Sequence, residues 1–201
     1  MRRFVLIGQT ASATGDFSLE DLPSTSGRID VLLRSLRAAL LVSHGLRRDV
    51  QVYLVLRGGV GEPRLLRIDG RTAKFLRPDE RSLATLVKKT LVVATPGSSF
   101  VDVRPGLALR QGDLSELLEE VGDAPCFVLE EGGADIRAEN IARDDAWFFI
   151  GDHTGFDVVA LALLERRGAR RIAVGPVSLH SDDVVTLVSN ELDRRFSSST
   201  D

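Results

Sequence analysis

The sequence predicts an α/β fold in which a mostly parallel sheet carries helices on both faces. Short apolar runs alternate with segments whose apolar residues recur at helical spacing, and this rhythm is clearest after residue 125. The runs are apolar throughout, as expected of strands that are buried on both faces. Loops that contain glycine follow the last three runs, where strands of such a sheet lead into helices.

Each element is predicted from its own local pattern. Strands are predicted at 3–7, 50–56, 64–68, 126–129, 146–150 and 171–174. Helices are predicted over 28–44, from Pro78-Asp79-Glu80 onward, after an Asp113 cap, and over about 157–167 and 182–195. Loops are expected between 8 and 27 and around 95–97, and the tail 197–201 is expected to fray.

Length and composition favour one domain over 1–201. No apolar run reaches the roughly 18 residues that a membrane span needs, and the N-terminal apolar run is too short for a signal peptide. The only cysteine, Cys126, excludes an internal disulfide and favours a reducing, cytoplasmic location. Its apolar neighbours predict a buried strand cysteine rather than a reactive thiol.

Charge is distributed unevenly between the two halves of the chain. Residues 1–100 hold 16 Lys+Arg against 9 Asp+Glu, whereas residues 101–201 hold 10 against 20. Most of the basic residues are arginines, which suit bidentate contacts with phosphate. We therefore expect a basic half that faces RNA and an acidic half, although solvated helix faces that happen to segregate would give the same counts.

Three glycine-containing loops mark the expected ligand site. They follow the strands at 126–129, 146–150 and 171–174, and the second reads Gly-Asp-His-Thr-Gly over 151–155. Because the carboxyl ends of parallel strands share one edge of the sheet, these loops would form a wall of backbone groups, suited to a flat group such as adenine. Plain tight corners are the alternative. Phosphate-loop and nucleophile-elbow motifs are absent from the sequence, and the three histidines lack the spacing of metal ligands.

A series of motifs in the same order resembles a known family. "DLPSTSGRIDVLLRS", "SHGLRRDVQVYLVL", "PDERS", "LVKKTL", "TPG", "FIGDHTGF", "VGPVSLH" and "VSNELD" are similar to the archaeal tRNA pseudouridine-54 N1-methyltransferases of the SPOUT class. The resemblance covers nearly the whole chain. It implies a homodimer, a C-terminal trefoil knot and S-adenosylmethionine as the cofactor, without a metal or a membrane.

The resemblance also implies particular site residues. Cofactor contacts are expected at Leu129, Gly151, Val174, Gly175, Pro176, Val177, Ser178, Leu179 and Val184. Two departures from the family pattern occur here, Val184 where cysteine is common and "LHSDD" where "LHADH" is common. Backbone contacts survive both changes, so cofactor binding is still expected.

The N-terminal half supplies the expected catalytic and RNA-binding residues. Asp30 is expected to act as the base or as an orienter of the reacting N–H, and Arg28 to face the oxygens of the target ring. Arg47, Arg48 and Arg34 are expected to contact the RNA backbone. The alternatives are helix-terminal charge for Asp30, a phosphate contact for Arg28, and pairing with acids for Arg47 and Arg48.

Three functions are open on these grounds. The first is N1-methylation of pseudouridine-54 in tRNA. The second is methylation of a pseudouridine in ribosomal RNA, which a comparison of RNA fragments would separate from the first. The third is an RNA-binding factor without catalysis, which S-adenosylmethionine would not stabilise.

Overall fold

The computed structural model describes residues 1–74, 76–93 and 97–197. An eight-stranded sheet runs through both halves of the chain in the order β10-β8-β9-β1-β4-β5-β7-β6. Its strands are β1 (Arg2–Ser12), β4 (Val50–Gly58), β5 (Arg64–Asp69), β6 (Val101–Arg104), β7 (Leu107–Gln111), β8 (Cys126–Asp135), β9 (Trp147–Gly151) and β10 (Arg170–Ala173).

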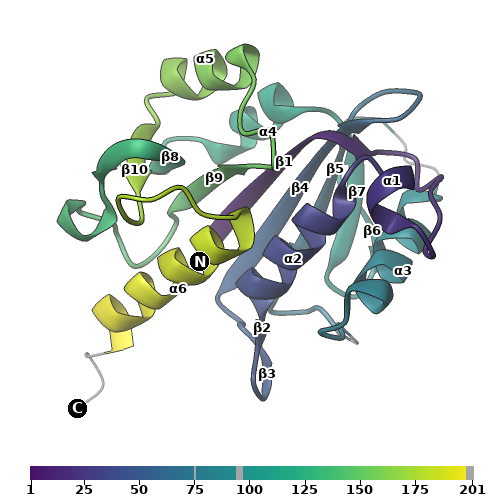
Figure 1. Ribbon diagram of the computed structural model, residues 1–201, viewed down its shortest axis with the longest axis horizontal. Helices are drawn as coiled ribbons and strands as arrows, with labels where there is room; N and C mark the ends of the chain where they lie inside the picture. Colours follow the sequence, from purple (N-terminus) through teal and green to yellow (C-terminus); the bar gives the residue numbers. More distant parts are fainter. Residues whose placement is uncertain (75, 94–96, 198–201) are drawn as a thin grey trace.

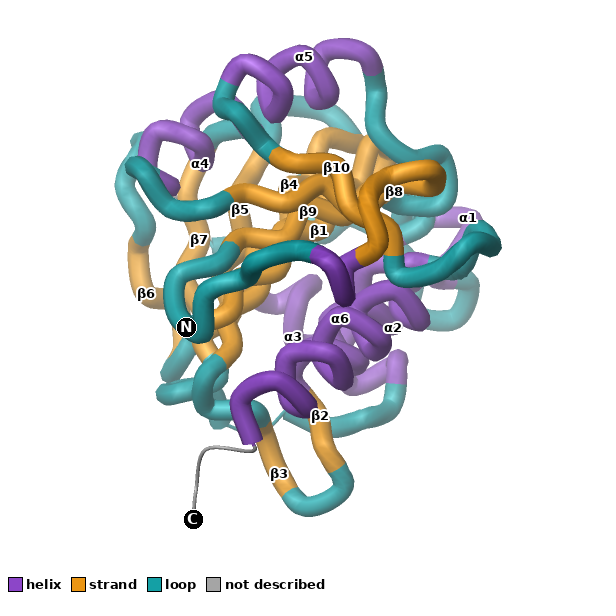
Figure 2. The backbone as a smooth tube through the Cα atoms, turned by 90° about the vertical axis from the view of Figure 1, so that its left-hand side faces the viewer, coloured by secondary structure: helices purple, strands orange, loops and turns teal. Residues whose placement is uncertain are grey.

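Helices cover both faces of this sheet. They are α1 (Leu22–Thr25), α2 (Ile29–Leu40), α3 (Glu80–Leu91), α4 (Leu114–Val121), α5 (Val158–Arg166) and α6 (Ser181–Ser197), with a 3₁₀ turn at Ile136–Ala138. In Figure 1, α2 and α6 lie side by side in front of the strands, and the two helices pack against each other. The perpendicular view in Figure 2 places α4 and α5 on the opposite side of the sheet from α2, α3 and α6.

The pairing of the strands divides the sheet into two parts. The strands β10, β8, β9, β1 and β4 pair in parallel, whereas β5, β7 and β6 continue the sheet in antiparallel pairs. Phe4, Phe127, Phe148 and Phe149 are fully buried at the centre of the parallel part. The expected mostly parallel sheet with helices on both faces is therefore confirmed in outline, with an antiparallel extension that the sequence pattern did not indicate.

Most predicted elements are confirmed, with several corrections. The loop predicted between 8 and 27 is wrong in part, because β1 continues to Ser12 and α1 lies within this stretch. The helix predicted over 28–44 ends at Leu40, because a two-stranded hairpin of β2 (Leu41–Val42) and β3 (Gly45–Leu46) follows it. The strands β6 and β7 were not predicted, and β8 continues beyond the predicted 126–129. Residues 95–96 of the predicted loop, and 198–201 of the predicted frayed tail, lie outside the described residues.

Two further expectations concern Cys126 and the membrane. Cys126 is 4% exposed within β8, as predicted, and burial raises the pKa of its thiol. Among the helices that the structure describes, none has the length and apolar character needed to span a bilayer.

Candidate cofactor and RNA site

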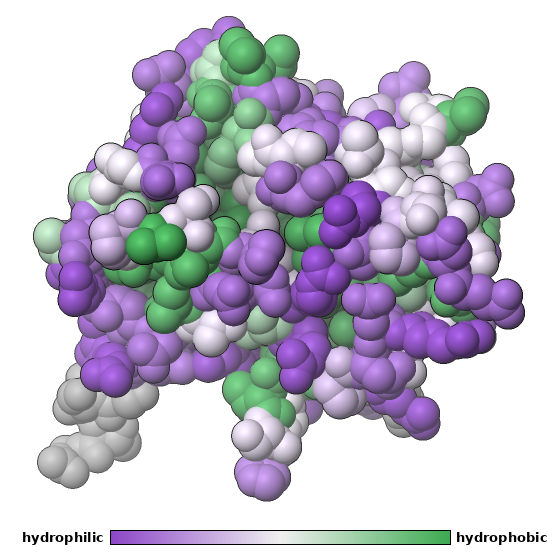
Figure 3. All heavy atoms as spheres, viewed as in Figure 1, coloured by the Kyte–Doolittle hydropathy of each residue, from purple (hydrophilic) through white to green (hydrophobic). Residues whose placement is uncertain are grey.

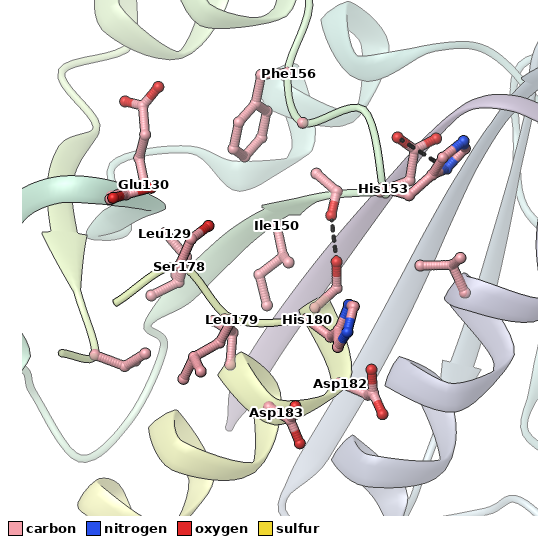
Figure 4. Close-up of a pocket in the computed structure, with 18 of the residues that line it drawn as sticks. Leu129, Glu130, Ile150, His153, Phe156, Ser178, Leu179, His180, Asp182 and Asp183 are labelled. Carbon is pink, nitrogen blue, oxygen red and sulfur yellow. Dashed lines mark hydrogen bonds and ion pairs between the residues drawn. The ribbon is translucent and has the colours of Figure 1, made fainter. Parts of the chain in front are cut away.

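A large cavity opens at the carboxyl ends of β9 and β10 and beside the middle of β8. Its volume is about 930 Å³, which lies within the range of small-molecule sites. Its walls come from these strands, from the segment between β10 and α6, and from the first turns of α2 and α6. Figure 4 shows Leu129, Ile150, Ser178 and Leu179 gathered around this space. The loops predicted after β9 and β10 gather here, whereas residues 130–133, which were predicted as a loop, lie within β8 where its pairing with β10 is irregular.

The Gly-Asp-His-Thr-Gly loop owes its two glycines to its own backbone. A Cβ atom on Gly151 would lie 2.5 Å from the carbonyl carbon of Gly155, and Gly155 itself has a φ of +76°. An isolated β-bridge joins Asp152 to Gly155 within the loop. The tight corner therefore requires glycine at both positions, and close approach of a ligand is not needed to explain Gly151.

Asp152 anchors the same loop to β1. Its carboxylate accepts hydrogen bonds from the backbone N–H of Gln9 at 2.8 Å, from the backbone N–H of Thr154 at 2.8 Å and from the Thr154 hydroxyl at 2.7 Å. The Asp152 side chain is 1% exposed. A buried carboxylate with three donors holds the corner in one geometry.

The segment between β10 and α6 forms the opposite wall. The hydroxyl of Ser181 donates to the carbonyl oxygen of Gly151 at 2.8 Å and so ties the start of α6 to the end of β9. Figure 3 shows apolar atoms gathered around this segment, and Val177 and Leu179 are 66% and 42% exposed. In contrast to Gly151, a Cβ atom on Gly175 would meet nothing within 4 Å. The backbone at Gly175 is thus open to a ligand.

The predicted cofactor residues gather at this cavity. All of them except Pro176 line it, and their contact with a cofactor stays a prediction. The sequence analysis did not single out four acidic residues that also line the cavity, Glu130, Glu131, Asp182 and Asp183. The available signal was that two of them directly follow the apolar run 126–129 and that the other two lie in the first turn of a helix.

These residues fit S-adenosylmethionine by their chemistry. The buried side chains of Leu129 and Ile150 offer an apolar surface to an adenine ring, while the open backbone at Gly175 offers polar groups without side-chain bulk. Glu130 is paired with Arg171 at 3.3 Å, whereas Glu131, Asp182 and Asp183 favour a ligand that carries positive charge, as a sulfonium and an ammonium do. A cavity that combines apolar surface, open backbone and negative charge suits a positively charged nucleoside better than a negatively charged triphosphate.

Arg28, Asp30 and Arg34 form a paired cluster at the start of α2. Nε of Arg28 lies 3.0 Å from Oδ1 of Asp30, and Nη1 of Arg34 lies 3.0 Å from its Oδ2. The Asp30 side chain is 3% exposed, whereas those of Arg28 and Arg34 are 40% and 42% exposed. Burial raises the pKa of Asp30, but the hydrogen bonds and charges of the two arginines outweigh it and leave the pKa below its ordinary value. Both arginines line the cavity.

The backbone at Arg28 is strained. Arg28 has a φ of 67°, directly after Gly27 at 63°, although side chains disfavour this left-handed region. A Cβ atom on Gly27 would lie 1.7 Å from the carbonyl oxygen of Thr10, so β1 passes directly over this turn. The turn presents the Arg28 guanidinium to the cavity. Strained residues of this kind are concentrated at functional sites.

Arg47 and Arg48 lie far from this cluster. Both precede β4, at the amino ends of the parallel strands, whereas the cavity is at the carboxyl ends. Arg47 is paired with Asp193, and Arg48 donates to the carbonyl oxygens of Gly70, Arg71 and Ala73. The structure thus brings Arg34 to the site but leaves Arg47 and Arg48 at the opposite ends of the parallel strands.

Comparisons with known proteins identify first the fold and then the family of this chain. The fold is that of Archaeoglobus fulgidus Nep1, solved with S-adenosylhomocysteine, with a TM-score of 0.64, 16% identity, and coverage of 96% of this chain and 97% of that chain. Residues 1–196 match the family model described as "Putative SAM-dependent RNA methyltransferase", and the chain belongs to that family.

Relatives in the same family are similar over nearly their whole length. The chain is 42% identical over 199 residues to a protein of Methanococcoides burtonii, with 98% of each chain covered. It is 43% identical over 198 residues to a protein of Methanosarcina mazei, with 96% of this chain and 92% of the relative covered. Both relatives are called tRNA (pseudouridine(54)-N(1))-methyltransferase. The resemblance inferred from the motifs is therefore confirmed.

Proposed function

We propose that this protein transfers the methyl group of S-adenosylmethionine to N1 of pseudouridine-54 in the T-loop of tRNA. The observation that carries the proposal is the cavity that reaches from β8 and the ends of β9 and β10 to Arg28, directly before α2. The cavity connects a binding site for a methyl donor with a positively charged binding site for a nucleobase. The names of the relatives and the family membership support the same reaction.

The main contribution of the protein to the reaction is to align the methyl donor with the target nitrogen. When bound, S-adenosylmethionine supplies a methyl group that positively charged sulfur has already activated. The cavity residues hold the donor against the target nitrogen and exclude water, and such alignment contributes on the order of 7–11 kcal/mol. Pseudouridine has a free N1–H because its sugar is attached through carbon, so only the modified base offers this nitrogen.

We assign Asp30 the role of orienting Arg28 rather than that of the base. A carboxylate that accepts hydrogen bonds from two guanidinium groups, with a pKa below the ordinary value, takes up a proton poorly at neutral pH. Arg28, held by Asp30, faces the ring oxygens on which negative charge develops as N1 loses its proton. Arg34 lies beside it and contacts the RNA backbone.

We further propose that the RNA extends along the molecule from this cluster. Arg48 is exposed and supplies a second, distant phosphate contact, while Arg47 serves mainly to hold the local fold through Asp193. The target nucleotide turns out of its stack to reach the cavity, as in other enzymes that modify bases. Contacts of this kind make the affinity for tRNA strongly dependent on salt.

The assembly is proposed to be a cytoplasmic homodimer of one domain, 1–201, with a C-terminal trefoil knot. Exposed apolar side chains near the cavity, Val158 at 83%, Val159 at 65% and Val177 at 66%, are surfaces that a second copy would cover. The hydrogen bond from Ser181 to Gly151 supports a return of the chain past the end of β9, as a knot requires. Light scattering after size exclusion checks the dimer.

Mass spectrometry of the RNA tests the reaction. Transfer RNA that carries pseudouridine-54 is incubated with the protein and S-adenosylmethionine labelled in its methyl group, and the expected product carries one label on the nucleoside at position 54. Matched tRNA with uridine-54 and a ribosomal RNA fragment with pseudouridine are the controls. A label only on the ribosomal fragment, or no stabilisation of the protein by S-adenosylmethionine in a thermal shift, would refute the proposal.

A further inference from the structure

We propose that His153 is a catalytic residue that accepts the N1 proton of the target nucleotide, and that Asp152 positions it. This inference rests on the proposed methylation and names the proton acceptor that the reaction needs. The sequence analysis did not assign His153 a role in catalysis. Its position in the loop between Gly151 and Gly155 now supplies one.

The imidazole has a fixed charged partner. Nδ1 of His153 lies 3.7 Å from Oδ1 of Asp152, within ion-pair distance. Asp152 cannot turn away, because Gln9 and Thr154 hold its two oxygens through three hydrogen bonds. The His153 side chain is 35% exposed, whereas that of Asp152 is 1% exposed. A buried, fixed carboxylate thus lies behind a half-exposed ring, an arrangement that orients the imidazole.

His153 lies on the side of the cavity where the nucleobase is proposed to sit. Figure 4 shows it at the end of the cavity towards α2, away from Glu130. The charge of Asp152 contributes to the raised pKa of Arg28, after the larger hydrogen-bond and charge effects of Asp30, so the loop and the cluster on α2 act on each other. His153 and Arg28 line the same cavity. A ring whose oxygens face Arg28 is proposed to turn its reacting edge towards His153.

The other groups at the cavity are less suited to take the proton. Asp30 is occupied by two arginines. Carboxylates have ordinary pKa values near 4, whereas imidazoles titrate near 6.5 and are the usual general bases at neutral pH. Of the described residues, no carboxylate lies within ion-pair distance of the His180 ring. The charged and titratable groups that line the cavity are Arg28, Arg34, Glu130, Glu131, Asp152, His153, His180, Asp182 and Asp183.

The step balances in atoms and charge. The N1–H bond breaks and the N1–methyl bond forms, while the electron pair of the methyl–sulfur bond stays on sulfur. The proton passes to Nε2 of His153, so the positive charge that leaves sulfur appears on the imidazolium. Neutral His153 is restored when this proton is lost to water.

Single-turnover methylation of pseudouridine-54 tRNA across a pH series tests the assignment. In His153→Gln we expect the rate at neutral pH to fall by about 10²- to 10⁴-fold and the decline of the rate at acidic pH to disappear. The affinities for S-adenosylmethionine and tRNA should stay within threefold. His44→Gln is the matched control, since His44 is exposed in the turn between β2 and β3. A wild-type rate in His153→Gln, or a lost acidic decline in His180→Gln instead, would overturn the proposal.

Two further measurements separate proton transfer from a structural role. The NMR signal of the His153 ring, assigned through His153→Gln, should titrate in the free protein with the midpoint seen in the pH profile of kcat/KM. Added imidazole should restore part of the rate of His153→Ala. Different midpoints together with no rescue would reject His153 as the acceptor. If wild-type protein methylates neither RNA, the proposed function fails, whereas active wild type with an unaffected His153→Gln defeats this inference alone.

Discussion

Two nitrogens of Arg47 donate to the two carboxylate oxygens of Asp193, at 2.9 and 2.7 Å, across 146 positions of the chain. Arg2 donates to the same carboxylate at 2.7 Å, so the start of β1, the approach to β4 and the end of α6 meet at one acid. Burial raises the pKa of Asp193, but the bonds and charges of Arg47 and Arg2 outweigh it and leave the pKa below the ordinary value. The pair joins the two halves of the fold.

Arg47→Ala is expected to destabilise the protein more than it weakens RNA binding. Removal of two charge-assisted hydrogen bonds from a half-buried carboxylate costs about 1–3 kcal/mol of unfolding free energy. Urea denaturation of the variant checks this, with the exposed Arg37→Ala on α2 as the control. Unchanged stability together with a large loss of tRNA affinity would instead restore the role predicted from sequence.

Asp30→Asn is expected to lower stability in a manner that depends on pH. The folded-state pKa of Asp30 is below its ordinary value, so its ionised form stabilises the folded state at neutral pH, and this contribution is lost as the pH falls through the folded-state pKa. The difference in unfolding free energy between wild type and variant should be full above about pH 5 and should shrink below about pH 4. Urea denaturation at pH 7 and pH 3 measures both values, and an equal difference at the two pH values would contradict the assigned pairing.

Asp30→Asn should also reduce methylation while leaving the affinity for S-adenosylmethionine unchanged. The amide keeps one acceptor for Arg28 but loses the charge that fixes the guanidinium, so we expect kcat to fall by about tenfold to a hundredfold. Isothermal titration with the cofactor is the control. A wild-type turnover rate in Asp30→Asn would show that Asp30 has no role in the reaction.

Gly175→Ala is expected to block the cofactor without disturbing the fold. The backbone of Gly175 is not left-handed, and an added Cβ atom has nothing within 4 Å, so the free protein should keep its Tm. A ligand that lies against this backbone would meet the methyl group, and we expect Kd for S-adenosylmethionine to rise about tenfold, or 1.4 kcal/mol. Gly151→Ala is the contrast, because its Cβ atom would strike Gly155 and lower the Tm directly. Wild-type affinity in Gly175→Ala would place the cofactor elsewhere.

Arg48→Ala is expected to weaken tRNA binding through the loss of one phosphate contact. The plot of log affinity against log salt concentration should become shallower by about one unit. Arg48→Lys keeps the charge and should keep the slope, which separates phosphate contact from the hydrogen bonds of Arg48 to the carbonyl oxygens of residues 70, 71 and 73. If Arg48→Ala has the slope of the wild type, the RNA does not reach the amino ends of the strands.

The sequence predicted the parallel part of the sheet far better than the antiparallel part. Apolar runs such as 146–150 are strong signals because both faces of the strand are buried. In contrast, β6 has only half-buried and exposed residues, so the edge of the sheet has no comparable pattern. The helix predicted over 28–44 was too long. Leu41 and Val42 are apolar and continue the helical spacing of apolar residues, although they form the first strand of the hairpin.

The candidate site was predictable where it depends on chain order and not where it depends on side-chain partners. Loops after parallel strands gather at one edge by topology alone, and the lining by Gly151 and Gly175 follows from this. The pairing of Arg47 with Asp193 depends on how α6 packs against α2, which no local pattern contains. For the same reason, the sequence left open whether Asp30 acts as a base or as an orienter, because its two arginine partners were not evident from local pattern.

The corner at Gly151 and Gly155 has a consequence for the divergence of such proteins. Since this wall of the cavity consists of peptide groups pressed against each other, its form is inherited through the path of the chain and only weakly through side chains. The sequences of such proteins can therefore diverge until little identity is left and still keep the same binding site for a small molecule. Substitutions of the arginines around this site would change which nucleic acid is bound.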